Sequence, residues 1–239
     1  MDTCGEEFQR LTKYSRGLLG GPPGPEVPEA GEARRVVRRV ALPPPGEAPP
    51  SDLWEAIGRR RSIRRYASRP LALVELSRLL WATQGITARA GAHAFRAAPS
   101  AGALYPLDTY VVSNRVDGLP AGLYTYQVGD HELGLLLEGD LSEAIAAAAA
   151  GQQMAAEAAA VFVWAAVLER STPKYGQRAY RYIYLDAGHL GAHLHLACEA
   201  LGLGCCAIGA FLDDEVDRLL GLDGTRETAI YLSAIGPQR

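Results

Sequence analysis

The stretch of residues 180–203 reads YRYIYLDAGHLGAHLHLACEALGL and has the longest helical pattern in this chain of 239 residues. Apolar side chains occur on more than one face of this helix, and such a helix must be surrounded by protein. The cover is either the rest of its own domain or a second subunit. In a chain of this size we predict that a homodimer interface covers it.

Three histidines in this helix are candidate metal ligands. His189 and His193 are four residues apart, so they share a face as zinc ligands require. No glutamate completes an HExxH motif, and His195 falls on another face. We therefore predict no metal site, and we expect these histidines to be satisfied by hydrogen bonds in an interface.

Composition limits the class of protein. The chain is 48% hydrophobic and 21% charged, with a net charge of −3, which fits one main soluble domain. The longest apolar stretch, residues 155–168, contains Glu157 and is too short to cross a bilayer, so we expect a helix end followed by a buried strand. The N-terminus lacks a signal pattern and the four cysteines show no CxxC spacing, which favours a cytoplasmic protein with reduced thiols.

The distribution of proline and glycine predicts the domain organisation. These residues are concentrated between 17 and 50, on either side of a β-prone stretch at 35–42. We predict an N-terminal extension or arm over residues 1–50 and a compact domain over residues 51–239.

Helices and strands mix in the compact domain without a regular βαβ alternation. This mixture predicts an α+β architecture with a mostly antiparallel sheet. The further predicted helices are 73–85, 141–158 and 213–220, and the predicted strands are 108–113, 123–126, 132–138, 160–167 and 229–235.

A dense basic run, RRRSIRRY at residues 59–66, closes a short amphipathic helix that Ser51 or Asp52 can cap. Guanidinium groups and the hydroxyl of Ser62 suit a bound phosphate. A nucleic-acid site would need basic residues over a wide face, whereas this chain is mildly acidic, so we predict no nucleic-acid partner. The alternative is a solvated helix end that the helix dipole favours.

The loop PSAGALYP, residues 99–106, consists largely of small residues. Small side chains let backbone amides approach a flat ring closely, although a plain turn would use the same residues. Other nucleotide signatures are absent: Gly202 and Gly204 follow a helix where a Rossmann fingerprint follows a strand, and no GxxxxGK[ST] occurs.

These segments resemble the flavin-dependent nitroreductase superfamily and, within it, the SagB-type or McbC-like azoline dehydrogenases. The resemblance covers most of residues 52–236. It is carried by RRSIR (60–64), PSAGALYP (99–106), GLYTY (122–126) and KYGQRAYRYIYLDAGHLGAHLHLACEALGLGCCAIGAF (174–211). It implies a nitroreductase-like α+β homodimer that binds FMN in a groove between its subunits.

The resemblance also implies roles for single residues toward FMN. Arg60 and Ser62 correspond to ligands of the phosphate and ribityl chain, with Arg61 beside them, and Arg64 to the cation that faces the pyrimidine edge. A fixed cation there stabilises the negative charge of the reduced flavin. The loop that the partner subunit lays against the ring corresponds to Pro99, Ser100, Ala101, Gly102 and Tyr105.

Two further positions complete the implied cofactor site. Ile208 and Gly209 fall where the superfamily lays backbone along the dimethylbenzene and N5 side of the flavin. Arg239 is the candidate for a further phosphate cation just after the last strand. The sequence ends there without the C-terminal arm of many relatives, so we expect the N-terminal extension to do any wrapping around the partner.

Lysine is rare in this chain: of 24 basic residues, only Lys13 and Lys174 are lysines. A desolvated lysine can give up its proton near neutral pH and arginine cannot, so general-base work explains a lysine at 174. Lys13 also precedes a tyrosine and has no evident role in the sequence. In the dehydrogenases that the chain resembles, a Lys-Tyr pair at this place assists removal of the Cα proton while the flavin takes hydride from Cβ. Tyr175 would then orient the base or relay the proton.

The sequence thus predicts an FMN-dependent enzyme that oxidises thiazolines or oxazolines to azoles in a peptide or peptide-like natural product. Molecular oxygen would reoxidise the flavin, and a cyclase or other modifying enzyme would be a partner. One alternative is a nitro- or quinone-reductase that uses NAD(P)H. Another is a noncatalytic flavin-binding subunit of a peptide-modifying complex.

Overall fold

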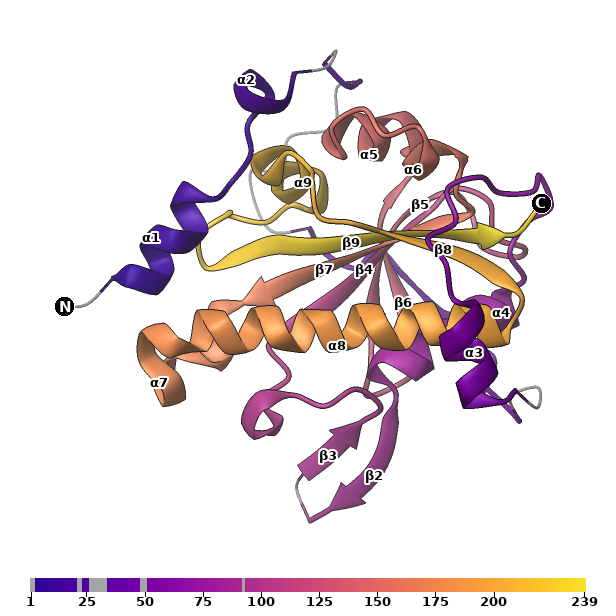
Figure 1. The fold of residues 1–239 in the computed structure, drawn as a ribbon, viewed down its shortest axis with the longest axis horizontal. Coiled ribbons are helices and arrows are strands. Elements are labelled where there is room, and N and C mark those ends of the chain that lie inside the picture. The colour runs from indigo at the N-terminus through magenta and orange to yellow at the C-terminus, as the bar shows by residue number, and fades with distance from the viewer. Residues whose placement is uncertain (1–2, 21–22, 26–33, 48–50, 92) are drawn as a thin grey trace.

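The computed structural model describes residues 3–20, 23–25, 34–47, 51–91 and 93–239. An antiparallel sheet of seven strands forms the centre of this described part, in the order β1-β6-β5-β4-β7-β9-β8 (Figure 1). Its strands are β1 (Arg38–Ala41), β4 (Leu107–Ser113), β5 (Gly122–Gln127), β6 (Glu132–Glu138), β7 (Ala160–Val167), β8 (Leu203–Ile208) and β9 (Glu227–Pro237). The predicted α+β class is confirmed, and each predicted strand lies within an observed one.

Strand β7 is buried along its whole length because its side chains are apolar on both faces. Phe162 and Trp164 point into one hydrophobic cluster, and Val161 and Val163 point into the other. This alternation follows from the two-residue period of a strand. The sheet therefore has a core on each side.

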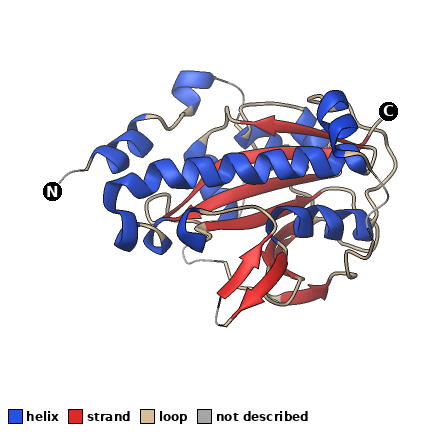
Figure 2. Ribbon diagram, turned by 60° about the horizontal axis from the view of Figure 1, so that its bottom comes forward, coloured by secondary structure: helices blue, strands red, loops and turns tan. Residues whose placement is uncertain are grey.

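Helices cover both faces of the sheet (Figure 2). Helices α4 and α8 pack on one face, and α5, α6 and α9 pack on the other. The helices are α1 (Cys4–Leu11), α2 (Arg16–Leu19), α3 (Leu53–Arg59), α4 (Leu73–Gln84), α5 (Ser142–Ala148), α6 (Met154–Glu157), α7 (Thr172–Tyr175), α8 (Ala179–Ala200) and α9 (Asp213–Leu220). No helix in the described residues is both long and apolar enough to span a bilayer.

The ends of two predicted helices are confirmed by their contacts. Asp52 caps α3, since its side chain accepts a hydrogen bond from Glu55 N at 3.0 Å. Helix α4 ends at Gly85, where a methyl group would lie 2.2 Å from the Trp81 ring. The backbone becomes extended at Gly85, and only glycine leaves room there for the Trp81 ring.

Two helix boundaries were predicted wrongly. The predicted helix 141–158 is broken into α5 and α6, because the chain takes positive φ at Ala150 (58°) and Gly151 (77°). The predicted helix 180–203 ends at Ala200, since Gly202 with φ of 68° turns the chain into β8. The hairpin β2 (Ile86–Ala90) and β3 (His93–Arg96) was also missed.

Helix α8 buries one face and exposes the other. Ile183, Leu190 and Leu194 pack into the core beneath it. On the opposite face Leu185 is 56% exposed. Gly188, His189 and Ala192 are exposed on the same side of the helix. Its own domain thus covers only part of the apolar surface that the sequence predicts to be buried.

Part of the predicted N-terminal extension joins the main sheet. Strand β1 lies within the β-prone stretch 35–42 and pairs with β6, where Val40 lies opposite Leu133. Residues 1–2, 21–22, 26–33 and 48–50 of the extension fall outside the described residues. The domain boundary at residue 51 remains a prediction.

Candidate functional site

The basic run continues from α3 as an extended segment along β8. Ile63 N donates to Cys205 O at 2.9 Å. The Tyr66 side chain is buried, and its hydroxyl lies 3.0 Å from Ala234 O. Burial raises the pKa of Tyr66 far above its ordinary value, so the phenol stays protonated as a donor. A methyl group on Gly204 would lie 2.8 Å from Ile63, so glycine in β8 lets the segment pack on the strand.

The arginines of this segment differ in their partners. Arg59 forms ion pairs with Glu55 at 3.4 Å and Glu199 at 3.2 Å. Within the described residues, Arg60, Arg61 and Arg64 form no ion pair with a carboxylate. Their charges are therefore available to an external anion.

Other predicted residues lie at the same edge of the sheet. Ser62 is exposed, and its backbone forms an isolated parallel β-bridge with Cys205 of β8. Arg239 Nε donates to Tyr66 O at 3.0 Å, which brings the last residue to the end of the basic run. Ile208 ends β8 with its side chain buried, and Gly209 after it is exposed. A phosphate and a chain of hydroxyls fit this donor set.

The loop of residues 99–106 is held by a buried carboxylate of α8. Ser100 Oγ donates to Asp186 Oδ2 at 2.5 Å and accepts from Tyr105 N at 2.9 Å. Ala101 N donates to Asp186 Oδ1 at 3.1 Å. Pro99, before these residues, is exposed. The Ser100 hydroxyl is thus occupied in shaping the loop.

Gly102 lies directly against the predicted Lys-Tyr pair. Its φ is 63°, and a methyl group there would lie 2.6 Å from Lys174 Nζ and 2.4 Å from Tyr175 Oη. Lys174 is exposed, and Tyr175 packs edge-on against Tyr182 with ring centroids 4.9 Å apart. The structure therefore brings together the predicted loop and the predicted catalytic pair.

We expect Gly102→Ala to move Lys174 while the fold is kept. The substitution puts a side chain at positive φ, a strain of about 1–2 kcal/mol, and the methyl group meets the ammonium and the phenol. NMR of lysine-labelled protein measures this, since the chain contains only Lys13 and Lys174. Gly129→Ala is the control because nothing lies within 4 Å of that position. An unshifted Lys174 signal in Gly102→Ala would contradict the contact.

Of the three histidines in α8, His193 forms a hydrogen bond within the part of the chain that the structure describes. His193 Nδ1 lies 2.9 Å from Ala82 O. His189 is exposed, and the buried His195 Nδ1 has no hydrogen-bond partner among the described residues. Across the described ranges, no group of three or more His, Cys, Asp or Glu residues could hold a metal ion.

Comparison with known proteins decides the family. The profile of the nitroreductase family matches residues 57–236. The chain belongs to the nitroreductase family. A nitroreductase-like protein of Methanocaldococcus jannaschii is 38% identical to it over 184 residues, which span 77% of this chain and 90% of that protein. The trifolitoxin-processing protein TfxB of Rhizobium leguminosarum bv. trifolii is 31% identical over 59% of this chain and 39% of its own length.

A solved structure agrees with this assignment. The crystal structure of a nitroreductase-like protein from Ralstonia eutropha superposes with a TM-score of 0.74 and 27% identity, covering 92% of this chain and 96% of that one. This nitroreductase-family protein is accordingly an oxidoreductase by family, and members of the family typically bind FMN.

Two residues that shape the site in this nitroreductase-family chain were not singled out from the sequence. Asp186 holds the 99–106 loop, and its only signal is a lone carboxylate on the buried face of an apolar helix. Arg96 lies over the Tyr105 ring, 4.6 Å from its centroid, and its backbone N donates to the Tyr105 hydroxyl at 3.1 Å. Nothing in the residues around Arg96 predicts that contact.

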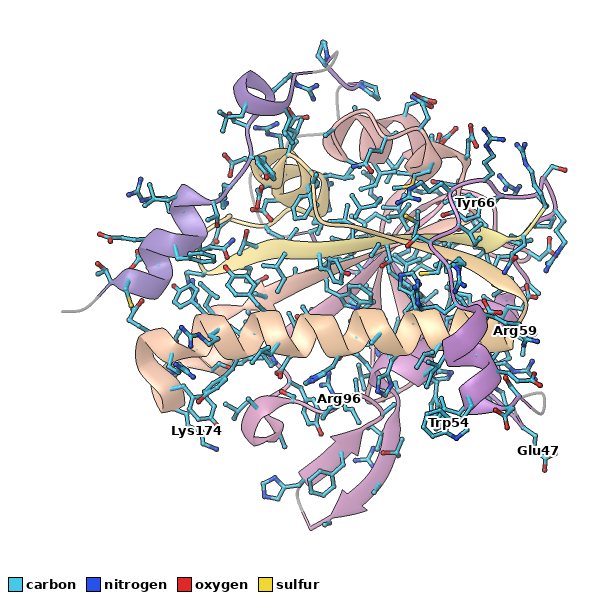
Figure 3. The ribbon with its side chains drawn as sticks, in the orientation of Figure 1. Glu47, Trp54, Arg59, Tyr66, Arg96 and Lys174 are labelled. Carbon is cyan, nitrogen blue, oxygen red and sulfur yellow. The ribbon has the colours of Figure 1, made fainter. Side chains whose placement is uncertain are left out.

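The two halves of the site lie far apart within one nitroreductase-family chain. Arg59 and Lys174 mark opposite ends of α8 (Figure 3). That helix has 22 residues and is therefore about 33 Å long at 1.5 Å per residue. The basic run and Lys174 of the same chain therefore lie toward opposite ends of this helix.

Proposed function

We propose that this protein is an FMN-dependent oxidoreductase that oxidises thiazoline or oxazoline rings in a peptide or peptide-like substrate to thiazoles or oxazoles. The observation that carries the proposal is the contact of Lys174 and Tyr175 with Gly102. It joins a candidate base to the loop that lies against the flavin in the superfamily. The similarity to a trifolitoxin-processing protein supports a peptide as the substrate class.

The residues of the basic run fit FMN. Arg60 and Ser62 bind the phosphate and ribityl chain, Arg61 lies beside them, and Arg64 faces the pyrimidine edge. The support is a set of arginines that no carboxylate neutralises within the described residues. Arg239 adds a cation from the end of β9, and the backbone at Ile208 and Gly209 lines the ring.

We further propose that two copies of the chain build each site. The length of α8 separates the two halves, so Arg60 of one copy and Lys174 of its partner complete a site between them. The exposed apolar face of α8, with Leu185, supports burial of this helix against a second copy. Leu53, Trp54 and Ile57 of α3 are further exposed apolar side chains in this chain.

We expect Leu185→Asp to convert the dimer into monomers and to release FMN. An unpaired carboxylate buried in the interface costs about 3–5 kcal/mol, which weakens association by at least about 10²-fold. Light scattering at low micromolar concentration measures the change. Val37→Asp is the control, because Val37 is 70% exposed and flanks β1 at the far edge of the sheet. A wild-type monomer that keeps FMN would refute the shared site.

In the proposed reaction Lys174 receives the proton from Cα of the azoline ring. Lys174 must be the neutral amine to accept this proton, and Tyr175, with its hydroxyl beside the same glycine, orients that amine or relays the proton. When bound, FMN supplies the acceptor for the hydride that leaves Cβ, and molecular oxygen is the final acceptor. Asp186 fixes the loop of residues 99–106 through Ser100 and Ala101, and this loop lies against the base Lys174.

The second candidate function is a nitro- or quinone-reductase that uses NAD(P)H. The family name and the relative in Methanocaldococcus jannaschii favour it. Such an enzyme needs the flavin site but no Cα base. The position of Lys174 against the loop would then have no catalytic reason.

Anaerobic flavin bleaching distinguishes the two functions. We expect a synthetic thiazoline peptide to bleach the bound flavin and NADPH to bleach it slowly or not at all. Rapid bleaching by NADPH with steady turnover of a nitroarene would favour the reductase. A yellow protein that no donor bleaches would contradict both enzymatic functions and favour a noncatalytic flavin-binding subunit.

A further inference from the structure

The segment that carries Lys174 is too short to be stable by itself. It consists of α7, four residues long, and the 3-10 turn Gly176–Arg178, joined at Gly176 with φ of 53°. Isolated helices of this length do not persist in water, so tertiary contacts must hold them. Lys174 is itself exposed and gives little burial to anchor the segment.

The N-terminal helix α1 lies beside the start of α8 (Figure 1) and contacts this segment at Gln177. Gln177 Oε1 accepts from Gly5 N at 2.9 Å and Glu6 N at 3.1 Å. The first N–H groups of a helix have no partner within the helix, and the side chain of Thr3 makes no cap bond here. Gln177 therefore caps α1 from a distant part of the chain.

Close packing at Gly5 makes this contact specific. A methyl group on Gly5 would lie 2.5 Å from the Tyr180 ring and 2.7 Å from Gln177 O. Only glycine allows α1 to approach the start of α8 this closely. The helix and the turn at Gln177 thus stabilise each other.

The other end of the N-terminal segment is bound to helix α9 and to Gly224 in the turn that follows it. Lys13 Nζ lies 3.0 Å from Asp214 Oδ1, 3.3 Å from Asp217 Oδ2 and 2.9 Å from Gly224 O. An ammonium group has three donors on a point charge and suits three converging oxygens better than a planar guanidinium. Tyr14 N also donates to Asp213 Oδ2 at 2.8 Å, so the segment is held at both ends.

We propose that residues 3–16 form a clasp that fixes residues 172–178 and thereby keeps Lys174 Nζ against Gly102. Gln177 is the positioning residue that joins the clasp to the segment. The clasp itself is independent of the reaction, and only its effect on catalysis rests on the proposed function. Residues 3–16 of the extension then act on their own chain, and wrapping of the extension around a partner stays a prediction.

The test compares Gln177→Leu with Gln177→Glu in the full-length, flavin-loaded protein. Leucine removes the acceptor for both N–H groups, and glutamate keeps it. We expect trypsin to cut after Lys174 and Arg178 at least about fivefold faster in Gln177→Leu, the scale of a lost helix cap, and at the original rate in Gln177→Glu. Lys13→Met, at the far end of the clasp, is expected to have the same effect as Gln177→Leu.

Cleavage after Arg89 in the exposed β2–β3 hairpin is the internal control. Faster cleavage at Arg89 as well would mean general destabilisation and would overturn the positioning role. Unchanged cleavage after Lys174 in Gln177→Leu would overturn the clasp. In kinetics we expect Gln177→Leu to lower kcat for the thiazoline peptide with little change in KM or FMN content. Local opening without azoline oxidation in any variant, wild type included, would uphold the clasp and refute the proposed function.

Discussion

Replacement of Lys174 by alanine or glutamine is expected to slow anaerobic flavin reduction by a thiazoline peptide by ~10²–10⁴-fold, the usual scale for loss of a general base. Oxygen should reoxidise the reduced flavin of the variant at a near-normal rate, because no Cα proton is removed in that step. Stopped-flow absorbance resolves the two half-reactions. The fold should be unchanged, since Lys174 is exposed. The FMN content should also be unchanged, because the proposed phosphate ligands are the arginines of the basic run and not this lysine.

Lys174→Arg is the matched control for charge. Arginine keeps the positive charge but cannot give up its proton near neutral pH, so a base role predicts that Lys174→Arg is as slow as Lys174→Ala. A near-normal rate of flavin reduction in Lys174→Arg would assign an electrostatic role to the lysine. An unchanged reductive rate in Lys174→Ala would remove it from the reaction. Tyr175→Phe should slow flavin reduction less than Lys174→Ala or Lys174→Arg does, since the phenol only orients the base or relays the proton.

Arg60→Ala is expected to weaken FMN binding by roughly 10- to 150-fold, the effect of losing a charge-assisted hydrogen bond of about 1.5–3 kcal/mol. The guanidinium has no carboxylate partner among the described residues, so its removal leaves no buried charge behind. Flavin retained after dialysis, measured by absorbance, reports the change. The bound cofactor is expected to be FMN, because the sequence contains no fingerprint for binding the adenine half of FAD.

The neighbouring arginine supplies the control for this experiment. Arg59 is held by Glu55 and Glu199, so Arg59→Ala should change stability slightly and leave the FMN content as it was. If Arg60→Ala stays fully yellow after dialysis, the phosphate assignment is wrong. If Arg59→Ala loses as much flavin as Arg60→Ala, the loss is caused by the lower net charge of the segment and not by a specific phosphate contact.

The sequence was a good guide where local pattern and burial agree. Strand β7 could be placed because its apolar run is continuous, and α4 because its periodicity ends at Gly85. Strand β8 was missed because the apolar pattern of α8 runs on into it, and only the left-handed turn at Gly202 separates the two. The break at Gly151 was missed because alanine on both sides favours a helix.

The features of the site that could not be predicted from the sequence depend on contacts between distant segments. The role of Asp186 depends on a loop 85 residues away that comes to rest on its carboxylate. The rarity of lysine indicated a special role for Lys174, but Lys13 is explained by geometry, through its three oxygen partners. Scarcity alone therefore does not identify a base. The contact of Lys174 with Gly102 is the stronger argument.

The length of α8 determines how substitutions in the two chains of the proposed dimer are distributed over its two sites. In the proposed dimer each chain lends its arginines to one site and its lysine to the other. A mixed dimer of one chain lacking Arg60 and one lacking Lys174 would therefore hold both lesions in a single site and leave the second site wholly intact. Two inactive parents would yield an active hybrid, as happens only when every site belongs to two chains.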